Sequence, residues 1–291
     1  MADVEFTIER DGYATIRLLS DGGGPYGFQT NTQGLGVGPV VPQFRDGVGD
    51  GARFDGDTVG AKPMDLGITV QGDDRLHTGK LIRNLRNLMR WRKNQPLPRL
   101  VATWANGDIL EVPFTYTSGL EQDYTNALPW RFDATVAVMC PDPYWTARSA
   151  LSFSVEPDTS ATPFLDDLAQ LPVASSNAMG SRTVTNSGDV AADLTVIIKG
   201  PTTGLTTVLV NGIGWVFKTA LSAAETITVE RSPLGVTVTD QLGANRYADL
   251  AAAPKFPQLP PGDSTVFISM LGAVAGSRAS GFWKNRYEGV Y

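Results

Sequence analysis

Few residues in this sequence are of the types that carry out nucleophilic or metal chemistry. The 291-residue chain has one cysteine, Cys140, and one histidine, His77. A single cysteine excludes an internal disulfide, and a thiolate nucleophile would need His77 beside it as a base. Cys140 ends an apolar, alternating stretch, which favours a buried and unreactive thiol. We therefore expect no catalytic cysteine–histidine pair and no transition-metal site.

Four aspartates lie among glycines in a pattern that could hold a calcium ion: Asp46, Asp50, Asp55 and Asp57. Calcium loops of the EF-hand type close with a glutamate at the twelfth position, and none stands there. The same glycines lack the Gly-Lys-Ser/Thr ending of a phosphate-binding loop. No Gly-x-Ser-x-Gly sequence is present, and nothing selects a pair of carboxylates for acid–base catalysis. We expect no enzymatic activity, no cofactor and no metal.

The composition indicates a protein of two ordinary domains. Hydrophobic residues make up 42% of the chain and the net charge is −6. No apolar run approaches the ~18 residues of a membrane span, and the overall charge does not favour specific nucleic-acid binding. The start of the chain, Met1–Glu5, has neither a basic nor an apolar stretch, so we expect no secretory signal and synthesis in a cytoplasm.

A glycine-rich segment, about residues 21–60, changes the character of the first domain. The first sixty residues hold 13 of the 31 glycines. Long segments without a core of their own are usually functional or disordered. We expect a β-arm that makes contact with another copy of the chain.

One amphipathic helix is expected at about residues 79–93. Its apolar residues have helical spacing: Leu81, Ile82, Leu85, Leu88 and Met89. Between Arg75 and Gly107 there are eight Lys or Arg residues and no acid. This basic side could be simply solvated, could meet an acidic face of a neighbouring copy, or could contact DNA. We predict that a subunit interface includes these basic residues: Lys80, Arg83, Arg86 and Arg90.

The middle of the chain marks a boundary between a domain of residues 1–145 and a domain of residues 146–291. Residues Phe132–Val138 alternate as in a half-buried strand. Pro141 and Pro143 then force an extended exit, and two large aromatic residues follow, Tyr144 and Trp145. We predict that Pro141, Pro143, Tyr144 and Trp145 form a clamp between the domains.

Short alternating segments predict strands throughout both domains. In the first domain they are Val4–Glu9, Tyr13–Leu19, Met64–Val70, Leu100–Trp104 and Ile109–Tyr116. In the second they are Leu151–Val155, Arg182–Thr185, Leu194–Ile198, Thr207–Val210, Trp215–Phe217, Thr226–Glu230, Val236–Thr239, Thr265–Met270 and Ser280–Arg286. Only Phe164–Leu171 has a helical pattern there, and even spacing of strands is typical of a β-sandwich.

The order of these features resembles the distal tail protein of long-tailed bacteriophages, a siphophage tail component family. In the first half the resemblance depends on the Met64–Val70 strand, the helix with Leu81, Leu85 and Leu88, and the Phe132 strand followed by Asp142–Trp145. In the second half it depends on motifs at residues Thr185–Asp193, Ile197–Pro201, Leu259–Ser264 and Trp283–Tyr287. The resemblance extends over most of the chain.

The resemblance implies a mainly β protein with a ring-forming N-terminal domain that carries one helix and a long β-arm, followed by a galectin-like β-sandwich. It implies a structural virion protein at the distal end of the tail. Six copies would form a ring between the tail tube protein and the tail-tip or baseplate hub. DNA would pass through the ring without specific binding, and no membrane would be involved.

A carbohydrate-binding role at the host surface is the alternative that the sequence leaves open. Galectin-like sandwiches can bind sugars through aromatic side chains. The second domain has five candidates: Trp215, Tyr247, Trp283, Tyr287 and Tyr291. Aromatic residues in a small sandwich more often fill its core.

Overall fold

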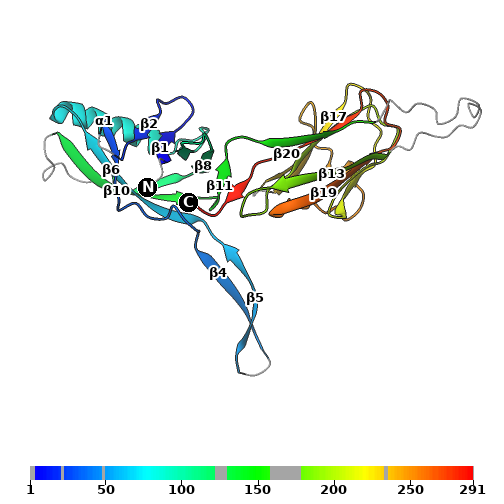
Figure 1. Ribbon diagram of the computed structural model, residues 1–291, viewed down its shortest axis with the longest axis horizontal. Coiled ribbons are helices and arrows are strands. Elements are labelled where there is room, and N and C mark those ends of the chain that lie inside the picture. The colour runs from blue at the N-terminus through cyan, green and yellow to red at the C-terminus, as the bar shows by residue number, and fades with distance from the viewer. Residues whose placement is uncertain are drawn as a thin grey trace, which may run out of the picture. The chain divides into compact units, whose positions relative to one another are not determined.

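A computed structural model of the chain describes residues 4–20, 23–47, 50–121, 130–157, 178–232 and 235–290. The protein is mainly β and divides into two compact units (Figure 1). Unit 1 comprises Met1–Arg148 and Tyr287–Tyr291, and unit 2 comprises Ser149–Arg286. The helix expected at Phe164–Leu171 lies outside the described residues. In the described ranges, no helix has the length and apolar character that crossing a membrane requires.

Among its described residues, unit 1 contains two sheets, one α-helix and a separate hairpin. One sheet has the order β2-β1-β7-β8-β11-β21 and the other has the order β3-β6-β10-β9. The strands of the first are β1 (Val4–Glu9), β2 (Ile16–Leu18), β7 (Arg99–Trp104), β8 (Ile109–Pro113), β11 (Trp145–Ala147) and β21 (Arg286–Tyr287). Those of the second are β3 (Tyr26–Phe28), β6 (Lys62–Gln71), β9 (Thr115–Ser118) and β10 (Arg131–Cys140).

The longest ladder of unit 1 joins β6 and β10, the two strands that alternation predicted best. Their pairing runs from Arg131 opposite Gln71 to Cys140 opposite Lys62. Alternate residues of both strands are buried, because one face of the sheet covers the core and the other does not. The ladder is therefore the part of unit 1 against which the helix packs and from which the hairpin projects.

The helix α1 (Arg75–Met89) begins and ends about four residues earlier than the expected range 79–93. Its start is set by Asp74, whose side chain accepts a hydrogen bond from His77 N at 2.7 Å. Its end is set by Arg90, where the backbone becomes extended. The buried stripe contains Ile82, Leu85, Leu88 and Met89, and α1 packs against β6 and β10.

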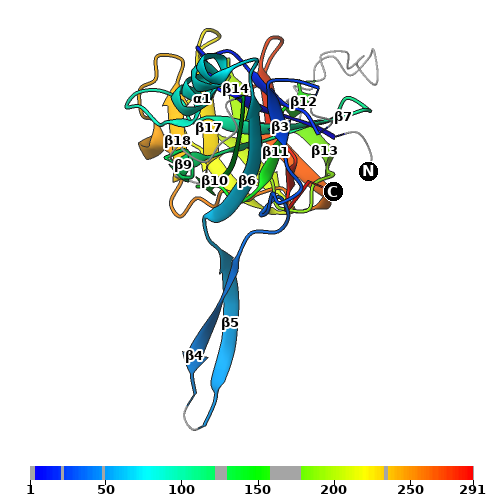
Figure 2. The ribbon, with the colours of Figure 1, turned by 90° about the vertical axis from the view of Figure 1, so that its left-hand side faces the viewer.

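The hairpin of β4 (Val40–Asp46) and β5 (Ala52–Val59) is a sheet of its own and projects from unit 1 (Figure 2). We call residues 40–59 the arm. The expected arm of about 21–60 was too long at its start. Tyr26–Phe28 pairs with β6 instead, because Tyr26 is buried and its hydroxyl donates to Leu81 O at 3.0 Å.

One expected strand, Ile109–Tyr116, is in fact two strands in different sheets. β8 pairs with β7 in the first sheet, and β9 pairs with β10 in the second. Phe114 lies between them, fully buried, and its N–H donates to Pro98 O. The chain changes sheets here because this ring enters the core that the two sheets share.

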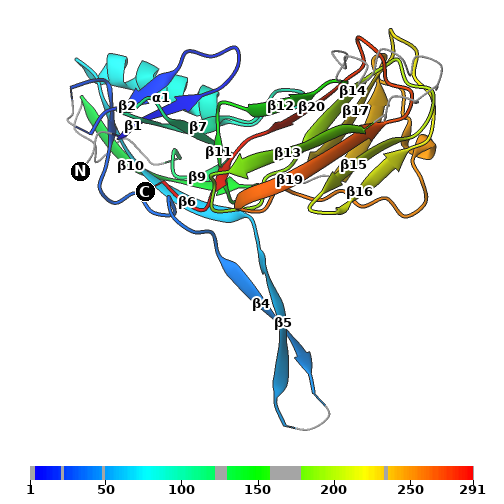
Figure 3. The ribbon, with the colours of Figure 1, turned by 45° about the vertical axis from the view of Figure 1, so that its right-hand side comes forward.

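Unit 2 is a β-sandwich of two antiparallel sheets, ordered β12-β20-β14-β17-β18 and β13-β19-β15-β16 (Figure 3). The first contains β12 (Leu151–Val155), β14 (Thr195–Lys199), β17 (Thr226–Ser232), β18 (Gly235–Asp240) and β20 (Arg278–Trp283). The second contains β13 (Ala178–Asn186), β15 (Thr206–Val210), β16 (Ile213–Phe217) and β19 (Gly262–Met270), and a 3-10 turn, η3 (Tyr247–Asp249), follows β18. One apolar cluster fills the space between the sheets.

Three motifs of the second half of the sequence meet at one buried asparagine. Asn186 Nδ2 donates to Val190 O and Leu259 O, both at 2.9 Å, and its Oδ1 accepts from Gly188 N. Gly188 lies so close to Arg286 that an added Cβ would stand 2.3 Å from the Arg286 carbonyl oxygen. These residues are therefore a structural junction that joins distant segments of the sandwich.

We expect Asn186→Ala to destabilise unit 2 by about 3 kcal/mol, because buried backbone groups lose their partners. Urea unfolding followed by circular dichroism measures this loss. The matched control is Asn245→Ala, which removes an exposed asparagine that bonds only locally, to Tyr247 N. A loss for Asn186→Ala no larger than that of the control would contradict the junction.

Candidate subunit interface

The arm is the candidate interface because its side chains lie in solvent. Every residue of β4 is exposed. Phe44 and Phe54 pack edge-on with ring centroids 5.9 Å apart, yet their exposed fractions are 63% and 57%. An isolated two-stranded hairpin is marginally stable in water. Its exposed aromatic pair therefore favours an arm that is docked on another surface.

The two faces of the arm differ in chemistry. Residues opposite each other in the register share a face, so Phe44 and Phe54 lie with Asp46, Ala52, Pro42 and Asp57. Arg45 pairs with Arg53 on the other face. A bulge between Gln43 and Phe44 shifts the register, and Gly56 takes a φ of 124° that favours glycine. The bulge places Asp57 on the face that carries Phe44 and Phe54, which we call the aromatic face.

The four aspartates considered for a calcium site belong to the arm. Asp55 Oδ2 pairs with Arg45 at 2.8 Å, and Asp57 lies on the aromatic face with Asp46. In the described ranges, no group of three His, Cys, Asp or Glu side chains is arranged to hold a metal ion. The arm presents these carboxylates to solvent instead.

The base of the arm is anchored to the core of unit 1 by Lys62 and Trp145. The Lys62 ammonium donates to Gly36 O at 2.8 Å and lies 5.7 Å from the centre of the Trp145 ring. Trp145 is fully buried, and its Nε1 donates to Leu35 O at 3.0 Å. Burial lowers the pKa of Lys62. No local pattern in the sequence predicts a buried lysine here.

The residues expected as an inter-domain clamp take part in this anchorage. Pro143 is buried, and a Cβ added at Gly38 would stand 3.1 Å from its Cβ. Tyr144 N–H donates to Asp142 Oδ1 at 3.2 Å, while Pro141 is exposed. Trp145 contributes to the core of unit 1. A clamp between the units stays a prediction.

Cys140 and His77 lie at opposite ends of the β6–β10 ladder. Cys140 is opposite Lys62, whereas His77 follows the end of β6 at Gln71 and contacts Asp73 at 2.9 Å. Nine residues of strand separate the two ends by about 30 Å. They cannot act as a nucleophile and its base.

The thiol of Cys140 will not react in the folded protein. It is completely buried, and this burial raises its pKa from 9.0 to about 12. At pH 8 we expect no reaction with a thiol reagent in native buffer and one thiol per chain in denaturant. The absorbance of the reaction product, read at the end of the reaction, gives the number of reacted thiols per chain in each condition. Rapid labelling of the native protein would contradict the burial.

The basic residues expected at an interface lie on or just after α1. Lys80, Arg83 and Arg90 are exposed. Arg86 is partly engaged, because its guanidinium donates to Leu120 O. The carbonyl of Arg90 accepts from Arg10 at 2.7 Å, which fixes the end of the helix. A contact between these residues and another molecule stays a prediction.

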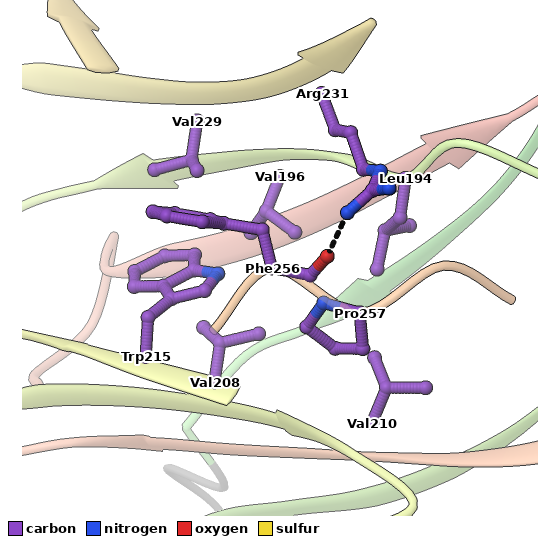
Figure 4. Close-up of a pocket in the computed structure, with 9 residues that line it drawn as sticks. All are labelled: Leu194, Val196, Val208, Val210, Trp215, Val229, Arg231, Phe256 and Pro257. Carbon is purple, nitrogen blue, oxygen red and sulfur yellow. Dashed lines mark hydrogen bonds between the residues drawn. The ribbon is translucent and has the colours of Figure 1, made fainter. Parts of the chain in front are cut away.

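Of the aromatic residues considered for sugar binding that the structure describes, only Tyr247 is exposed. Trp215 and Trp283 are buried in the core of unit 2, whereas Tyr247 is exposed and Tyr287 half-buried. Tyr291 lies outside the described residues. Beside Trp215 a cavity of about 10 Å³ has room for about one water molecule. Phe256 is one of the residues that line it, and the Phe256 carbonyl accepts from Arg231 (Figure 4).

Comparison with known proteins identifies the fold. Neither a protein-family profile nor a curated protein sequence matches the chain. The crystal structure of the Dit protein of phage SPP1, a hub adsorption apparatus protein of phages that infect Gram-positive bacteria, has a TM-score of 0.64 at 15% identity, over 97% of this chain and 98% of that chain.

Two structures of the phage P2 baseplate in its activated conformation are also similar. The calcium form has a TM-score of 0.53 at 8% identity, and the strontium form 0.50 at 9%. Each match covers 99% of this chain and 100% of that chain. The chain therefore has the fold of SPP1 Dit along nearly its whole length.

Proposed function

We propose that this protein is a structural component of a phage tail, a ring at the distal end that joins the tail tube to the tail-tip or baseplate hub. The observation that carries the proposal is the exposed aromatic arm on a fold shared with a phage hub protein. The role is mechanical, so the protein needs no catalytic step.

In this proposal six copies close a ring through unit 1, and unit 2 lies at the ring's periphery. Each copy uses two different surfaces, one on each neighbour, because contacts of this kind close into a ring when the rotation between copies allows it. The arm is one of these surfaces. The net charge of −6 suits a ring through which DNA passes without binding.

Multi-angle light scattering tests the proposal directly. The full-length chain is measured alone and after mixing with the tail tube protein of the same phage. We expect a species of six times the 31.1 kDa chain mass in at least one of these conditions. A chain that stays at 31.1 kDa in both would contradict the ring.

A further inference from the structure

The solvent side of α1 carries two cations, Lys80 and Arg83, that have no acidic partner among the described residues. Leu76, Lys80, Arg83 and Asn87 have the spacing of one helical face, opposite the buried stripe. In the parts of the chain that the structure describes, neither Lys80 nor Arg83 forms an ion pair or a side-chain hydrogen bond. The same holds for Arg90 just after the helix.

Several arginines on other elements of unit 1 are paired with carboxylates. Arg17 pairs with Glu5 at 2.5 Å, and Arg148 with Glu9 at 2.6 Å and with Glu111. No acid lies between Arg75 and Gly107, and among the described residues no carboxylate from another element pairs with Lys80 or Arg83. The charge of the helix is therefore available to a second molecule.

Exposed apolar side chains stand at both ends of this basic face. Leu76 is 69% exposed at the start of α1, and Trp91 is 55% exposed just after its end. A surface that combines a large aromatic residue with unpaired cations suits a partner that is apolar and acidic.

The aromatic face of the arm has this chemistry. It joins Phe44 and Phe54 to Asp46 and Asp57, and the structure gives neither aspartate an ion pair. The lengths also agree. The 15 residues of α1 extend about 22 Å, and the 7 residues of β4 extend about 23 Å.

The arm cannot reach the helix of its own chain. It joins the sheet at Lys62, where β6 begins, whereas α1 follows the other end of β6 at Gln71. The ladder between those ends is about 30 Å long, and the arm projects away from it (Figures 2 and 3).

We infer that the aromatic face of the arm docks on the basic face of α1 of a second copy. The contact pairs Asp46 and Asp57 with cations such as Lys80 and Arg83, and it covers Phe44 and Phe54. It is heterologous, because each copy offers its arm to one neighbour and its helix to the other. The inference rests on the proposed ring and supplies its contact.

Charge reversal on each side tests the contact. The arm variant is Asp46→Lys with Asp57→Lys, and the helix variant is Lys80→Glu with Arg83→Glu. Each variant alone places like charges together, so we expect its mass to fall to 31.1 kDa. All four side chains are exposed, so the thermal unfolding temperature should stay that of the wild type.

Mixing the two variants provides the decisive control. In an alternating ring, the reversed arm of one variant meets the reversed helix of the other, and both remaining surfaces are wild type. We therefore expect an equimolar mixture of the two variants to regain the wild-type mass. In a mixture with wild type, either variant should stay at 31.1 kDa beside the wild-type ring.

Three results would overturn the inference. If each variant alone assembles like the wild type, the contact between arm and helix is refuted, whereas the proposed ring is not. A mixture that stays monomeric would show that the two surfaces do not meet. If the helix variant assembles normally but loses retention on DNA-cellulose, α1 contacts DNA instead. A wild-type chain that never assembles contradicts the proposed function itself.

Discussion

Removing the arm will abolish assembly and leave both units folded. Residues 40–59 can be replaced by two glycines, because Pro39 O and Gly60 N lie 3.4 Å apart at the base of the hairpin. The shortened chain should remain a monomer under conditions in which the wild type forms a species of six times 31.1 kDa. The measurement is light scattering, with and without the tail tube protein.

The arm contributes little to the stability of unit 1, so its loss should change the free energy of unfolding by less than about 1 kcal/mol. A finer variant, Phe44→Ser with Phe54→Ser, should also prevent assembly. Its matched control is Leu242→Ser in unit 2, which removes a side chain that is 87% exposed and should leave assembly unchanged. An intact ring without the arm would refute its role.

The second large effect is expected at the base of the arm. Trp145→Ala should lower the stability of unit 1 by about 3–5 kcal/mol, the range for a buried tryptophan. The substitution empties a fully buried site, removes a hydrogen bond to Leu35 O, and uncovers the ammonium of Lys62. Urea unfolding followed by circular dichroism measures the loss.

Trp130→Ala is the control for this effect. Trp130 stands just before β10 and is 40% exposed, so its loss should cost about 1 kcal/mol or less. If the two variants lose equal stability, Trp145 contributes no more to unit 1 than an exposed tryptophan does, and its role as the buried anchor at the base of the arm is contradicted. A loss confined to the control would contradict the core of unit 1 as described.

The sequence predicted best those strands that have one buried face. Met64–Val70 and Phe132–Val138 alternate because every second residue enters the core, so alternation located β6 and β10 within one or two residues. The same reasoning located most strands of the sandwich. At Phe114 the chain passes from one sheet to the other, so the alternation there follows no simple period. The prediction therefore joined β8 and β9 into one strand.

The ends of α1 were harder to predict, because the apolar stripe begins only at Leu81. The first turn, Arg75–Thr78, has one apolar residue, Leu76, which is exposed, and Gly79 follows it, so the pattern gave no reason to extend the helix toward Arg75. Asp74 was the available signal, since an aspartate before a helix can accept a hydrogen bond from its first turn.

The anchorage of the arm could not be predicted from local patterns. Lys62 is buried only because the carbonyl of Gly36 and the ring of Trp145 meet it there, and both are distant in the sequence. The register between β6 and β10 places Lys62 opposite Cys140. Long-range pairing of this kind carries no signal within a window of neighbouring residues.

The glycine-rich segment was predicted as an arm from composition, and only part of it is one. Tyr26 and Phe28 provide side chains that pack on unit 1, so this part forms β3. Residues 40–59 have their apolar side chains in solvent and pair only with each other. The chemistry of the two faces became visible only through the register and its bulge.

An electron cryo-microscopy reconstruction of the intact phage particle would locate this chain within the assembly. We expect six copies in a closed ring between the tail tube and the tip, with each arm on a neighbouring copy. Density that places the chain outside a symmetric ring, or elsewhere in the particle, would contradict the proposed ring.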